Sequence, residues 1–185
     1  IKILPGGVVT AKDTAEIELD ANGEFVRNPG VDLVKVAVVE RHQGTGNVAC
    51  GFLKGYGIKE GAVALSVAHD SHNIIVVGVN DEEMEFAVNS LIEQEGGIVL
   101  VKEGKVIESM PMPIAGLMSD QSGEWVDQKL TDIHEKAYEE LGICGDVEPV
   151  MTLCFMSLAV IPEIKLTDMG LFDVTTFSFI PVEVE

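Results

Sequence analysis

Basic residues are scarce in this chain. Its 185 residues include 12 Lys and Arg against 31 Asp and Glu, which gives a net charge of -19. A surface of this sign repels the phosphate backbone of nucleic acids and the anionic face of a membrane. We therefore expect neither nucleic acid nor membrane as a partner, but a neutral or cationic molecule or another protein. The alternative, which we favour, is that the acidic residues only keep the protein soluble.

Cysteines and long apolar runs are also few. The three cysteines, Cys50, Cys144 and Cys154, form no CxxC pair, and we expect reduced core thiols in a cytoplasmic protein. No apolar run is long enough to span a bilayer, and the start "IKILPGG" lacks the order of a signal peptide. Because the chain enters at once on strand-like residues without an initiator methionine, we expect a piece of a longer protein.

The hydrophobic fraction of 46% is enough for a packed core, and 185 residues suit a single domain spanning 1–185. Alternating and valine-rich segments outnumber helical ones, and strands and helices do not alternate regularly. The sequence therefore predicts an α+β fold with a mainly antiparallel (mixed) sheet and packed helices. It is not a TIM barrel, which needs about 250 residues.

Individual elements follow from periodicity and from turn residues. Helices are expected at 81–95, where Asn80 and Glu83 resemble a capping box, and at 122–141. A hairpin is expected around Glu103 and Gly104. The expected strands are 1–4, 7–10, 15–20, 31–40, 61–68, 73–79 and 177–184; a short helix is expected at 47–57, and a helix or strand at 150–161.

The segment "SVAHDSHN" (66–73) places polar groups between two apolar runs. His69, Asp70 and His72 are residue types that bind metals or transfer protons. A complete metal site needs a third ligand, and the chain offers no motif such as HExxH to supply one. A serine nucleophile is disfavoured because no GxSxG motif is present. The alternative is a purely structural turn, in which Asp70, Ser71 and Asn73 cap backbone groups.

A second polar segment, "ERHQGTGN" (40–47), ends a valine-rich strand and continues into a glycine loop. Charged residues at a strand end beside a loop are a common site architecture, which singles out Arg41 and His42. The alternative is that Arg41 pairs with one of the many carboxylates and that His42 lies in solvent. His134 falls at the boundary of its helix's apolar stripe and receives no role.

Four segments taken together resemble the C-terminal domain of bacterial adenine deaminases, members of the amidohydrolase superfamily. They are "DLVKVAVVERHQGTGN", "GAVALSVAHDSHNIIVVGVND", "PMPIAGLMSD" and "IPEIKLTDMGLFDV". The resemblance implies an enzyme that hydrolyses adenine to hypoxanthine and ammonia. It also implies a manganese or iron centre in a preceding barrel domain, which this chain does not contain, so we expect no metal and no cofactor in this chain and no activity from it by itself.

The resemblance suggests a role for the 66–73 turn. We expect it to face the mouth of the barrel, with His69, Asp70 and His72 as catalytic residues at the purine edge. Ser71 and Asn73 would orient them, and Arg41 and His42 would support the same surface. The expected partners are the protein's own barrel domain, adenine and, in an assembly, further copies. Two alternatives stay open: a structural or oligomerisation module, and a free-standing domain that binds small molecules.

Overall fold

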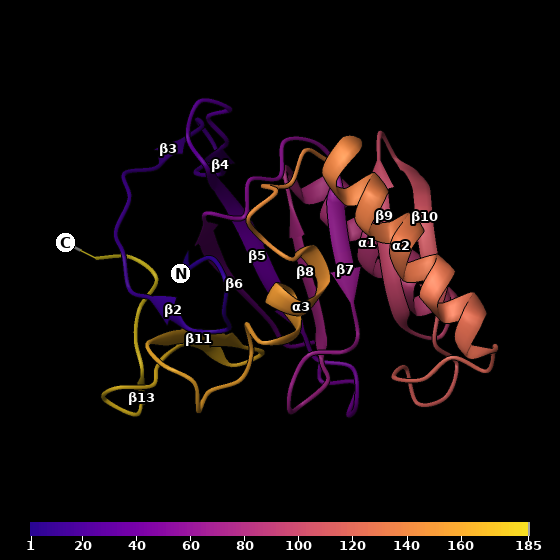
Figure 1. Cartoon of the computed structure of the whole chain (residues 1–185). Helices are drawn as coiled ribbons and strands as arrows, with labels where there is room; N and C mark the ends of the chain where they lie inside the picture. The colour runs from indigo at the N-terminus through magenta and orange to yellow at the C-terminus, as the bar shows by residue number, and fades with distance from the viewer. Residues whose placement is uncertain (185) are drawn as a thin grey trace.

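A mixed sheet of eight strands forms the centre of the computed structural model, which describes residues 1–184 (Figure 1). The strand order is β10-β9-β7-β8-β5-β6-β1-β2, and every neighbouring pair is antiparallel except β1 with β6. The strands are β1 (Lys2–Ile3), β2 (Thr10–Ala11), β5 (Leu33–Val39), β6 (Val48–Lys54), β7 (Ala62–Leu65), β8 (Ile74–Gly78), β9 (Gly97–Lys102) and β10 (Lys105–Pro111). The expected α+β fold with a mainly antiparallel, mixed sheet is confirmed.

The remaining elements are two small sheets and three helices. They are β3 (Glu18–Leu19) with β4 (Phe25–Val26), then β11 (Ile164–Thr167), β12 (Gly170–Asp173) and β13 (Ser178–Phe179), and the helices α1 (Asp81–Glu93), α2 (Gly123–Glu139) and α3 (Pro149–Cys154). No helix in residues 1–184 combines the length and the apolar character needed to cross a membrane.

Helices cover both faces of the sheet, because successive strand residues point to opposite sides. On one face, Leu91 of α1 packs among small residues such as Ala64. On the other face, Ile133 of α2 packs with Leu65 and Leu100. Figure 1 shows α2 and α3 in front of the sheet and α1 behind it. Each fully buried Leu or Ile contributes about 1.5–3 kcal/mol, so these two layers supply much of the stability.

The two long helices begin where the sequence predicts. The side chain of Asn80 accepts from the N–H of Glu83 at 2.8 Å and caps α1, and Ser122 caps α2 in the same way. Glu83 does not complete a capping box, since its carboxylate accepts from the N–H of Gly104 at 3.1 Å instead. That bond ties α1 to the β9–β10 turn. Glu103 and Gly104 both have positive φ, 52° and 66°, as the predicted tight hairpin requires.

The prediction of a helix at 47–57 is wrong, because this segment forms β6. All seven β6 residues pair with β5, and a side chain at Gly51 would contact Leu166, so pairing and close packing override the local pattern. The expectation of core thiols holds only for Cys154, which is buried. Cys50 and Cys144 are exposed, and all three cysteines are free.

The C-terminal segment differs most from expectation. The 150–161 run contributes only the six-residue helix α3, which Pro149 begins. The antiparallel hairpin β11–β12 was not predicted, although it packs against β6. The expected last strand at 177–184 is reduced to the two residues of β13.

Candidate functional site

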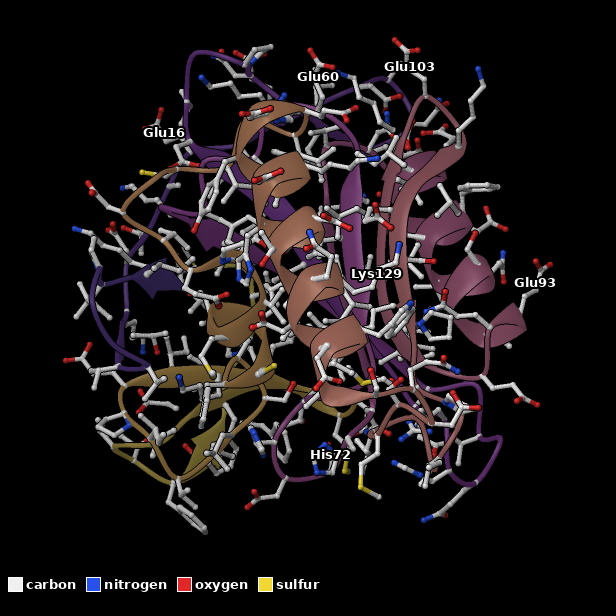
Figure 2. All side chains as sticks on the ribbon, turned by 45° about the vertical axis from the view of Figure 1, so that its right-hand side comes forward. Glu16, Glu60, His72, Glu93, Glu103 and Lys129 are labelled. Carbon is white, nitrogen blue, oxygen red and sulfur yellow. The ribbon has the colours of Figure 1, made fainter. Side chains whose placement is uncertain are left out.

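Three loops meet at one end of the central sheet, which we call the loop end: 40–47, 66–73 and 111–119. They meet because β5, β7 and β10 all finish at this edge in the antiparallel register, where Val39 pairs with Ile74. Figure 2 shows His72 at this end of the molecule. The two polar segments singled out from the sequence are therefore neighbours in space.

The 66–73 turn holds two imidazole rings side by side. The N–H of His69 donates to the carbonyl of Cys154 at 2.8 Å, and the N–H of His72 donates to that of Ala68 at 2.6 Å. The ring centroids of His69 and His72 are 5.3 Å apart in an edge-to-face arrangement. The His69 ring also packs on Phe155, with centroids 4.8 Å apart. The turn is thus fixed to α3 as well as to the sheet.

His72 is the most perturbed group of the turn. Burial lowers its pKa below the ordinary value of 6.5, and the neighbouring His69 and Arg41 lower it further. Its Nδ1 is buried and has no hydrogen-bond partner within residues 1–184. The lowered pKa favours the neutral form of the ring at neutral pH.

The capping alternative accounts for only one residue of the turn. The side-chain oxygen of Asn73 accepts from the N–H of Arg41, at 3.3 Å. Asp70 and Ser71 are exposed, and the carbonyl of Ser71 lies 2.7 Å from Nε2 of His42. His42 therefore touches the turn, although its side chain is exposed to solvent.

Arg41 joins the turn to the 111–119 loop. Its Nε donates to the carbonyl of His72 at 2.5 Å, and its Nη2 donates to that of Ala115 at 2.9 Å. Its guanidinium packs so closely on Gly116 that a Cβ there would lie 2.9 Å from Nη1. Within residues 1–184 the guanidinium thus binds carbonyl oxygens instead of the carboxylate that the alternative required.

Two further residues organise the loop end and were not singled out from the sequence as site residues. The carboxylate of Glu40 accepts from the N–H groups of Thr45, Gln43 and His42, and these bonds lower its pKa to about 2. The signal available in the sequence was an acidic residue before a loop with two glycines and one threonine. Such a carboxylate fixes the 40–47 loop from within.

Ser66 is buried and structural. Its hydroxyl donates to the carbonyl of Gly116 at 2.5 Å and accepts from the N–H of Gly97 at 2.8 Å. Both bonds reach residues far along the chain, so no local pattern could reveal them. This geometry leaves the hydroxyl occupied and does not suit a nucleophile.

The loop end does not have the ligand set of a metal site. In the part of the chain that the structure describes, no group of three or more His, Cys, Asp or Glu side chains could hold a metal ion.

His134 lies on α2, where its Nδ1 contacts the carbonyl of Leu130 at 2.6 Å and its Nε2 contacts Glu148.

A cavity of about 410 Å³ lies elsewhere, between the N-terminal and C-terminal segments. Its walls include Leu33, Phe52, Ile164 and Leu171, and it contains none of the seven residues predicted for the site. It is mostly apolar, with the ion pair of Lys54 and Asp13 among its lining residues. The predicted polar site and this cavity therefore lie in different parts of the domain.

Comparisons with known proteins agree with the resemblance seen in the sequence. A family model described as the adenine deaminase C-terminal domain matches residues 7–178. The chain is 71% identical over 183 residues, 99% of its length, to adenine deaminase 2 of Desulfotalea psychrophila. It is 49% identical over its full length to an adenine deaminase of Ligilactobacillus salivarius and 51% identical, over 97% of its length, to one of Desulfatibacillum aliphaticivorans. It spans 32%, 32% and 31% of these three relatives. The chain belongs to the adenine deaminase C-terminal domain family.

Proposed function

We propose that this chain is the C-terminal domain of an enzyme that hydrolyses adenine to hypoxanthine and ammonia. The observation that carries the proposal is the 71% identity over 99% of the chain to a protein named adenine deaminase 2. Because the chain spans only about a third of such relatives, the proposal concerns the whole protein. The chain by itself is expected to be inactive.

The loop end is the part of the domain that faces the catalytic domain. Two observations support this orientation: the polar groups of the 66–73 turn exceed what capping uses, and Arg41 fixes the turn in place. His69, Asp70 and His72 then lie at the substrate edge. Ser71, Asn73, Arg41 and His42 hold the same surface.

Residues of this kind suit the recognition of a purine. An exposed carboxylate such as Asp70 accepts hydrogen bonds from an amino group, and a neutral imidazole such as His72 can accept or donate one. Ordered polar groups that close a site against water also strengthen every electrostatic interaction inside it.

The metal belongs to the catalytic domain in this proposal. A manganese or iron ion there supplies hydroxide by lowering the pKa of bound water. The lack of a suitable ligand cluster in residues 1–184 is the reason for placing no ligand on this chain. The free state of all three cysteines supports a reducing compartment, which is the cytoplasm.

The test is kinetic and uses the full-length enzyme. We expect Asp70→Asn and His72→Ala each to lower kcat/KM for adenine at least tenfold, about 1.4 kcal/mol of transition-state stabilisation. The matched control is Asp146→Asn. Asp146 is exposed and lies away from the loop end, near Cys144, and the N–H of Cys144 donates to the carbonyl of Tyr56. Thermal unfolding of each variant separates a lost contact from a lost fold.

Two results would contradict the proposal. If the wild-type full-length protein does not deaminate adenine, the enzymatic assignment is wrong. If it does, but both loop-end variants stay within about threefold of wild type, below roughly 0.7 kcal/mol, the orientation is wrong and the domain has a structural role. Sedimentation of the same variants then shows whether that role is assembly.

A further inference from the structure

The 111–119 loop is an apolar segment at the surface of an acidic protein. No charged residue occurs between Glu108 and Asp120, although 23% of the chain is charged. Two of its hydrophobic side chains are largely exposed, Ile114 at 46% and Met118 at 57%. Exposed apolar side chains that gather on a soluble protein mark a contact surface. We call Ile114 and Met118, with the loop that carries them, the apolar ridge.

Two polar side chains, one of them buried, hold the ridge in one conformation. Ser66, which is fully buried, donates to the carbonyl of Gly116 at 2.5 Å, and Arg41 donates to that of Ala115 at 2.9 Å. Ile114 and Met118 are joined by a β-bridge across the loop. A free surface loop has no need of such anchoring, whereas a preorganised contact loses less entropy when it binds.

The ridge is also continuous with the polar turn. Arg41 binds both, through the carbonyl of His72 on one side and that of Ala115 on the other. Within the three loops the carboxylates are those of Glu40 and Asp70, and Glu40 is occupied by the N–H groups of its own loop. Glu95, next to Gly96, and Asp120 flank the 111–119 loop. The ridge is therefore an uncharged segment within an acidic surface.

We propose that the apolar ridge docks on the catalytic domain of the same polypeptide and seals the edge of the active site next to the 66–73 turn. This inference rests on the proposed function. Two observations indicate that the ridge contacts the catalytic domain. In the relatives, about two-thirds of the polypeptide lies outside this domain. Arg41 also anchors both the ridge and the turn that is proposed to face the catalytic domain. Apolar contacts on the rim exclude water from the polar contacts inside it.

Methionine oxidation tests the docking directly, because the ridge contains a thioether. Hydrogen peroxide converts exposed Met to the sulfoxide, which mass spectrometry locates. In the full-length enzyme we expect Met118 to oxidise at least tenfold more slowly than in the same enzyme unfolded in denaturant. Met169, which is 71% exposed on the β11–β12 hairpin, is the internal reference for an uncovered side chain.

A pair of variants shows whether the protection comes from the ridge. Ile114→Asp places a carboxylate in the contact and should raise the oxidation rate of Met118 at least fivefold in the full-length enzyme. Val31→Asp is the matched control, since Val31 is 45% exposed and precedes β5, whose other end forms the loop end. It should leave the rate of Met118 unchanged.

Three results overturn the proposal: Met118 oxidises as fast as in the unfolded enzyme, Ile114→Asp leaves its protection intact, or the protection disappears on dilution. The last of these assigns the contact to a second copy instead of the same polypeptide. Oxidation rates do not depend on which substrate the enzyme uses. The oxidation experiment therefore tests docking even if the enzyme does not deaminate adenine.

Discussion

Lys165 offers a test of the energetics within the domain. Its side chain is fully buried on β11, and its ammonium donates to the carbonyl of Val8 at 2.9 Å. Burial lowers its pKa from 10.5 to about 8. This difference corresponds to about 3 kcal/mol of cost for burying the charge at neutral pH.

Replacing Lys165 with Met keeps the length of the side chain and removes the charge. The carbonyl of Val8 loses its partner, which costs about 1 kcal/mol because Val8 is only partly buried and water can reach it. The variant should therefore be more stable than the wild type by about 2 kcal/mol at pH 7.

The pH dependence is the sharper part of the prediction. Between pH 8 and 10.5 the unfolded wild type holds a proton on Lys165 that the folded protein has lost, so the free energy of unfolding of the wild type rises with pH. Below pH 8 both states are protonated and the full cost applies. The advantage of Lys165→Met should thus fall by about 3 kcal/mol across this range and change sign.

Urea denaturation of both proteins at pH 7, 8, 9 and 10 measures the difference directly. Taking the difference between the two proteins cancels the titration of groups that they share. A difference that stays constant from pH 7 to pH 10 would refute the reasoning. So would a variant that is less stable than the wild type at pH 7 by more than 1 kcal/mol.

Two further substitutions test hydrogen bonds from side chains to the backbone, one at the loop end and one at the start of α3. Ser66→Ala leaves the N–H of Gly97 and the carbonyl of Gly116 without their partner, and we expect a loss of about 3 kcal/mol in urea denaturation; a loss below 1 kcal/mol would contradict the role of this hydroxyl. Glu148→Ala removes the side chain that caps α3 at Met151, and we expect a loss of about 1 kcal/mol in the same assay, which Glu148→Asp should partly restore.

Local chemistry was enough to predict some elements. Asn80 at the start of α1, and Glu103 with Gly104 in the β9–β10 turn, act within a few residues of themselves, so their effect is visible in a short window of sequence. The candidate site was also chosen from a short window of sequence, and its role stays a prediction. His69, Asp70 and His72 attract attention because polar groups interrupt two apolar runs, whatever lies around them.

The sequence by itself determined the acidic surface, the long helices, the β9–β10 hairpin and the polar turn, because each depends on composition or on residues close together in the chain. Only the tertiary structure decided that β6 is a strand and that three loops share one end of the sheet, because antiparallel pairing joins segments that are distant in sequence. It also decided that Ser66 and Arg41 hold the 111–119 loop, since their partners, Gly116 and Ala115, are 50 and 74 residues away.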